Sequence, residues 1–159
     1  MNDDLRQMVY QSLADVFGIM FYIPIEPLAD QPPREMWESE KHYVEARIAI
    51  NCGDGSSFQA MFFFPEDLAR NIAINFMGID EEAVDEEKVI DAVREAANMA
   101  VGGLLGKIDP EAKCQLGIPS ATMSTGFSPG GLLDAPGACV YETEFGYLWI
   151  DFGNLDRIG

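Results

Sequence analysis

Four residues in the second half of the chain have side-chain types and a spacing that could do chemistry. They are Asp91, Glu95, Asn98 and Gly102. At 100° per residue these positions fall within about 60° of one another, so a helix would place them on one stripe. The stripe is costly for a helix, because carboxylates four residues apart repel each other and Asn and Gly are weak helix formers. Such violations on one exposed face favour a docking or catalytic site.

The same stripe has a simpler interpretation. Acidic and amide side chains on the outer face of a helix are commonly just solvated. Lys88 and Arg94 are also near enough in sequence to relieve the repulsion at Asp91. Periodicity alone therefore leaves both interpretations open.

Two other motifs do not fit the chemistry that they suggest. Residues 126–130 match G-x-S-x-G, but a nucleophile elbow needs a strand before it, a helix after it and a later histidine, and the single histidine is His42. Residues 102–107 resemble a phosphate-binding loop, but the glycine spacing is one residue short and Ile108 replaces the Ser or Thr. One histidine also leaves no basis for a zinc cluster or a histidine relay, so no metal site is predicted.

The elements that must position the stripe follow from apolar periodicity. Helical spacing predicts an N-terminal helix within residues 1–22, a helix from Pro65 to Gly78, and a long helix over 85–107 that carries the stripe. A proline-rich acidic connector over 23–42 is expected to lack regular structure. Strands are predicted at 43–51, 58–64, 116–123 (with Pro119 marking an edge or bulge), 139–145 and 147–152.

The order of these elements predicts the fold class. Hairpins at 43–64 and 139–152, in place of strand–helix alternation, favour an α+β domain in which an antiparallel sheet has its helices packed on one face. A length of 159 residues predicts a single domain over 1–159.

Composition limits the classes of partner and compartment. With 27 Asp and Glu against 10 Lys and Arg, the formal charge is −17, which excludes nucleic acid and anionic membranes as natural partners. Three cysteines without a CxxC spacing favour reduced thiols that behave as small apolar side chains. No signal peptide or membrane-spanning run is evident, so a soluble, cytoplasmic protein is expected.

The segment from Asp91 to Asn98 resembles the signature of the chemotaxis phosphatases CheC, CheX and FliY, in which Asp or Ser, three residues, Glu, two residues and Asn follow one another. The resemblance extends to Met99, Gly102 and Lys107, to the proline-bearing strand that begins at Gly117, and upstream to residues 57–78. CheC carries two such sites, but residues 3–20 contain no Glu-x-x-Asn, so the chain is similar to the single-site CheX.

This resemblance implies an activity: hydrolysis of the aspartyl phosphate on a phosphorylated CheY-type receiver domain. It implies that Asn98 positions the attacking water and that Glu95 anchors a receiver lysine, with Asp91 and Gly102 extending the contact. It further implies a homodimer, no cofactor bound by this chain, and Mg²⁺ held by the receiver. A non-catalytic adaptor of the same fold, binding a receiver or flagellar switch component, is the alternative.

Overall fold

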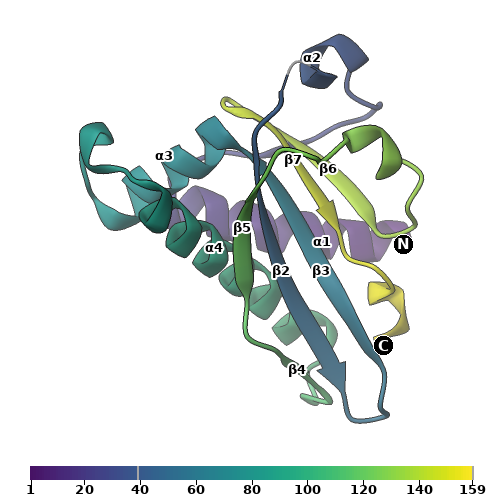
Figure 1. Cartoon of the computed structure of the whole chain (residues 1–159). Helices are drawn as coiled ribbons and strands as arrows, with labels where there is room; N and C mark the ends of the chain where they lie inside the picture. The colour runs from purple at the N-terminus through teal and green to yellow at the C-terminus, as the bar shows by residue number, and fades with distance from the viewer. Residues whose placement is uncertain (39, 159) are drawn as a thin grey trace.

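The computed structural model describes residues 1–38 and 40–158 as an antiparallel sheet with its three long helices packed on one face, which confirms the predicted α+β class (Figure 1). The strands are β1 (Glu26–Pro27), β2 (Tyr43–Cys52), β3 (Ser57–Pro65), β4 (Cys114–Leu116), β5 (Ser120–Ser124), β6 (Ala138–Thr143) and β7 (Gly146–Asp151). The helices are α1 (Asp3–Asp15), α2 (Arg34–Glu38), α3 (Glu66–Met77) and α4 (Glu86–Ile108).

The sheet has the strand order β1-β6-β7-β3-β2-β4, and β5 also pairs with β2. All of these pairings are antiparallel. The predicted hairpins form as β2–β3 and β6–β7. None of the described helices combines the length and apolarity that crossing a bilayer would need.

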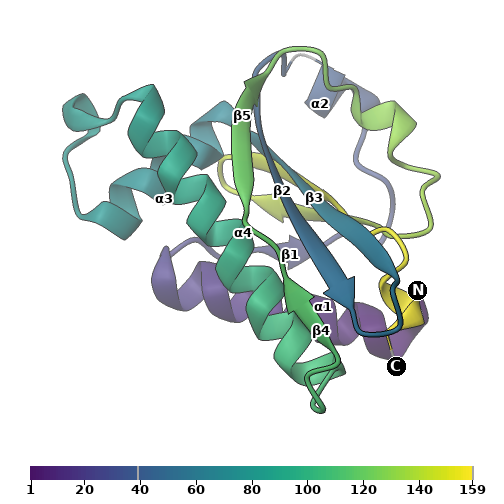
Figure 2. The same ribbon diagram turned by 60° about the horizontal axis from the view of Figure 1, so that its bottom comes forward.

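The alternation along β2 decides which face is covered. Val44, Ala46 and Ile48 are buried in the same core as the inner sides of α1, α3 and α4. Figures 1 and 2 show these three helices on one side of the sheet, with β5 at its edge beside α4. A smaller cluster on the other face joins Trp37 of α2 to Trp149 of β7. The long helices therefore share one face, and only the short α2 packs on the other.

The helix ends follow the expected rules. Asp85 caps α4 because its Oδ1 accepts from the backbone N–H of Lys88 at 2.9 Å, and this bond lowers the pKa of Asp85. Gly78 ends α3 in the left-handed conformation, with φ +63°. The predicted N-terminal helix forms as α1 followed by a π-helical turn at Val16–Met20.

The prediction that 23–42 lacks regular structure is wrong. The segment contains β1, which pairs with β6 at the sheet edge, and the helix α2. Prolines are compatible with both, because an edge strand needs few N–H donors and a proline before a helix removes only an unused donor. Trp37 holds α2 on the sheet because its buried ring packs against Trp149 of β7, and its Nε1–H donates to the Pro32 carbonyl of the preceding segment at 3.3 Å.

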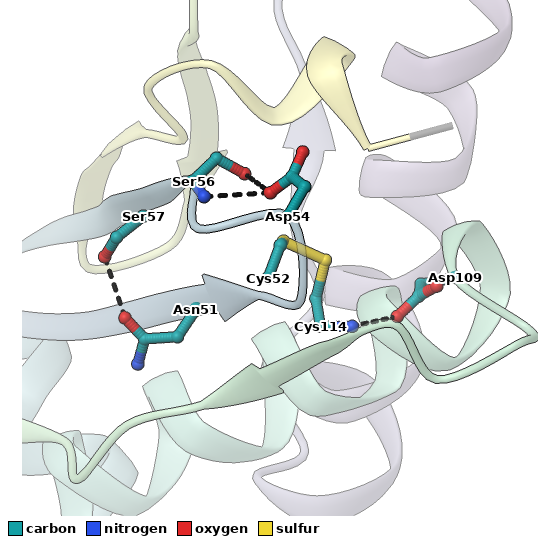
Figure 3. Close-up of a disulfide and its surroundings, with 7 residues drawn as sticks. All are labelled: Asn51, Cys52, Asp54, Ser56, Ser57, Asp109 and Cys114. Atoms are coloured by element: carbon teal, nitrogen blue, oxygen red, sulfur yellow. Dashed lines mark hydrogen bonds between the residues drawn. A yellow bond between two sulfur atoms is a disulfide. The ribbon is translucent and has the colours of Figure 1, made fainter.

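The expectation of three reduced thiols is also wrong. Cys52 and Cys114 lie directly opposite each other in the β2–β4 ladder, with Cα atoms 3.9 Å apart, and they form a disulfide (Figure 3). The Asp109 carboxylate accepts from the Cys114 backbone N–H at 2.7 Å and fixes the turn that brings β4 back. Cys139 is a free, buried thiol, and burial raises its pKa.

Removal of the disulfide should destabilise the fold, because it joins residues 62 positions apart. We expect the double variant Cys52→Ser/Cys114→Ser to lose about 2–5 kcal/mol of unfolding free energy in a urea titration. Reductant should lower the wild-type protein to the same stability and leave the double variant unchanged. A Cys139→Ala variant should keep the reductant sensitivity, and a wild-type protein indifferent to reductant would contradict this account.

Candidate functional site

The long helix α4 is positioned by its apolar face. Nine of its residues are buried against the sheet, α1 and α3, and they are mainly alanine and valine: Val89, Ala92, Val93, Ala96, Ala97, Ala100, Val101, Leu104 and Leu105. The predicted stripe occupies the opposite side, where Asp91 is exposed and Glu95, Asn98 and Gly102 are partly exposed. The structure therefore brings together the four residues singled out by spacing. We call them the α4 stripe.

Asp91, at the start of the α4 stripe, is already engaged. Its Oδ1 accepts from Nη2 of Arg94 at 2.6 Å, and both side chains are about half exposed, at 47% and 44%. Lys88 does not share this role, because its Nζ bonds to the Ala83 carbonyl and to Asp85. An exposed pair of this kind contributes little stability, so Arg94 can release Asp91 to another cation at small cost.

Glu95 and Asn98 differ from Asp91. Within the described part of the chain, neither side chain makes a hydrogen bond or ion pair. They lie three residues apart on one side of a packed helix, so their Cβ atoms are close neighbours. The structure thus presents one carboxylate and one amide that are free to bind an incoming group, on a backbone that is held from behind.

Gly102 is not required by packing. A Cβ built on it would meet Leu116 Cδ1 of β4 at 3.6 Å, which is an ordinary contact. The position is open on the solvent side, and β4 lies directly beside it. A glycine here therefore leaves a shallow place at the end of the α4 stripe where another backbone can approach.

Ile118 and Ser128 lie on either side of β5 in the chain, and the structure shows the surroundings of each. Ser128 of the G-x-S-x-G match follows β5, which ends at Ser124, but only a three-residue 3₁₀ turn at Pro129–Gly131 stands where a nucleophile elbow needs a helix. Ile118, beside α4, is 95% exposed although it is a large apolar side chain. Pro119 marked a bulge in the sequence, but nothing there showed which way Ile118 would point.

Replacement of Gly102 by alanine should stabilise the protein, since a Cβ fits and alanine favours the helix. We expect Gly102→Ala to raise the unfolding free energy by about 0.5–1 kcal/mol in urea titrations. Gly103→Ala is the matched control, because its Cβ would meet nothing within 4 Å. If only Gly102→Ala were destabilising, packing against Leu116 would require the glycine.

Comparison with known proteins supports this fold. The family model described as chemotaxis phosphatase CheX matches residues 48–140, which include β3, the whole of α4 and β5. No curated protein sequence matches the chain significantly.

Solved structures extend the likeness over nearly the whole chain. A CheX from Desulfovibrio desulfuricans has a TM-score of 0.69 at 16% identity, covering 93% of this chain and 97% of that one. A CheX from Vibrio vulnificus has a TM-score of 0.69 at 20% identity, covering 93% and 94%. The Borrelia burgdorferi CheX-CheY-BeF3-Mg²⁺ complex has a TM-score of 0.60 at 12% identity, covering 94% and 96%. These structures share the fold, and the family match shows that the chain belongs to the CheX family of chemotaxis phosphatases.

Proposed function

We propose that this chain hydrolyses the aspartyl phosphate of a phosphorylated CheY-type receiver domain. The observation that carries the proposal is the pair Glu95 and Asn98, which are unengaged and adjacent on the outward side of a helix packed from behind. The family match supports phosphatase activity, and one structure of similar fold is a complex of CheX with CheY. The α4 stripe would face the phosphoryl group of the receiver.

The reaction explains why an amide is sufficient. An acyl phosphate is already activated, so a water oxygen attacks phosphorus as the bond to the aspartyl oxygen breaks, and the aspartate carboxylate and inorganic phosphate are released. Mg²⁺, expected on the receiver, would offset charge on the phosphoryl oxygens. Asn98 can hold the water in line because its amide both donates and accepts hydrogen bonds and carries no charge to repel the phosphoryl group.

Glu95 acts as an anchor in this proposal. A receiver lysine near the phosphoryl group would form a charge-assisted bond with its carboxylate and thereby fix the register of the complex. Asp91 would extend the contact when Arg94 releases it, and Gly102 would admit the receiver backbone. Association of two copies of this chain, as the CheX resemblance implies, remains part of the proposal.

Asn98 and Glu95 should affect different kinetic constants. With acetyl-phosphate-loaded receiver, we expect Asn98→Ala to lower kcat about 10- to 100-fold with little change in binding, which corresponds to about 1.5–3 kcal/mol of barrier. Glu95→Ala should chiefly raise KM, because it removes an anchor. Initial rates of dephosphorylation across receiver concentrations separate the two effects.

The controls for this experiment are Asn71→Ala on α3 and Glu87→Ala at the start of α4, which change the same residue types outside the α4 stripe. Both should keep wild-type rates. Unchanged rates in both Asn98→Ala and Glu95→Ala would refute the proposal. A wild-type protein that binds the receiver yet leaves or protects its phosphoryl group would instead be the adaptor.

Salt should affect association only slightly. The chain carries a charge of −17 and the phosphorylation pocket of a receiver is acidic, so long-range attraction cannot drive the encounter. We expect the association rate constant to fall little, or to rise, as ionic strength reaches about 0.15 M and the Debye length shortens to about 8 Å. Stopped-flow binding measures this, and a steep fall would contradict recognition by local pairing.

A further inference from the structure

The edge of the sheet beside the α4 stripe contains one extra residue. Leu116 of β4 pairs with Ile50 of β2, and Ser120 of β5 pairs with Arg47. Between these pairs β2 has two residues, at 48–49, whereas the edge has three, at 117–119. The three-residue break is therefore a β-bulge in what is otherwise one continuous edge strand.

The bulge determines where Ile118 points. Leu116 before the bulge and Ala121 and Met123 after it all pack against the core on the helix side of the sheet. Strict alternation from Leu116 would turn Ile118 to the same side. Instead Ile118 is 95% exposed, the most exposed large apolar side chain of the described residues. The extra residue thus takes an isoleucine out of the core and presents it to solvent.

The backbone around Ile118 is held in place. The Gly117 N–H donates to the Ala49 carbonyl at 2.8 Å, and a Cβ at Gly117 would come within 3.2 Å of Ala49 Cβ. On the other side Pro119 fixes its own φ and lacks the N–H that a ladder would use. Ile118 is accordingly presented from a fixed backbone position between two anchored strands.

The contact between Leu116 and the position of Gly102 allows the place of Ile118 along α4 to be estimated. Leu116 Cδ1 is 3.6 Å from a Cβ built on Gly102, and β4 and β5 run back along α4 (Figure 2). Two strand residues advance about 6.6 Å, which equals about four helical residues. Counting back four residues from Gly102 reaches Asn98. This count of average rises sets Ile118 at about the height of the proposed water-positioning amide along α4.

We propose that Ile118 is a docking residue that buries its side chain against an apolar patch of the receiver domain, next to the phosphoryl group that faces Asn98. This inference rests on the proposed function, because it assigns the occupant of the same surface. A folded partner that reaches Asn98 on α4 must also cover the bulge beside it. An apolar contact there supplies short-range affinity that two acidic surfaces cannot obtain from charge.

The test compares Ile118→Ala and Ile118→Asp with Ile19→Ala and Ile19→Asp, since Ile19 is also exposed, at 69%, but lies on the π-helical turn after α1. Burial of an isoleucine predicts that Ile118→Ala weakens receiver binding about tenfold or more. We expect kcat at saturating receiver to be retained, KM to rise, Ile118→Asp to be worse and Ile118→Val to recover most of the loss. Thermal stability should not change, because the side chain contacts little in the free protein.

Binding is also measured in an Asn98→Ala background with acetyl-phosphate-loaded receiver, so that the result does not depend on turnover. Unchanged affinity on adding Ile118→Ala overturns the inference, and so does an equal or larger loss in Ile19→Ala. If Ile118→Asp converted an oligomer to a monomer and left KM unchanged, Ile118 would belong to a contact between copies of this chain. That result would also overturn the inference. If Asn98→Ala and Glu95→Ala both kept the wild-type rate of dephosphorylation, the proposed function itself would be refuted, which keeps the two failures distinct.

Discussion

The packing of the inner face of α4 is the constraint on which the site depends. Alanine and valine dominate that face, so the helix lies close against the sheet and its neighbouring helices. Rotation of the helix by one residue would bring Asp91 or Glu95 towards an apolar interior, and burying an unpaired carboxylate is strongly unfavourable. The α4 stripe therefore keeps its direction because of what is buried behind it, without a hydrogen bond from the side chain of Glu95 or Asn98 to any side chain or backbone group within 1–38 and 40–158.

Much of the fold could be predicted because its signals are local. Alternation along 43–51 and 58–64 and the helical spacing after Asp85 each lie within one segment, and the structure has strands and a helix there. Pairing between distant segments leaves no such signal. Neither the β2–β4 ladder that brings Cys52 to Cys114 nor the pairing that makes a strand of Glu26–Pro27 can be derived from either segment alone. The error about the thiols and the missed strand β1 both arise from that non-local pairing, and the missed helix α2 packs on the sheet through the distant contact of Trp37 with Trp149.

Only part of the candidate site could be predicted from the sequence, and again it is the part whose signal is local. Spacing along one helix was enough to place Asp91, Glu95, Asn98 and Gly102 together. Spacing could not show that Arg94 engages Asp91 while Glu95 stays free, since that depends on side-chain conformations. The direction of Ile118 depends on a single extra residue, and that residue is visible only when the register of β2 with both β4 and β5 is known. Pro119 indicated a bulge but not its consequence.

The large negative charge of the chain explains why charged, amide and apolar side chains would have to act together in recognising the receiver. A surface with a net charge of −17 gains nothing at long range from an acidic phosphorylation pocket, so specificity must come from contacts made after the surfaces meet. Arg94 already compensates one carboxylate of the α4 stripe, which leaves Glu95 as the free negative group for a single lysine. An apolar contact is indifferent to the sign of the partner's charge. Together, an exposed isoleucine, a free carboxylate and a neutral amide could hold an acidic partner while the amide stays free to position water.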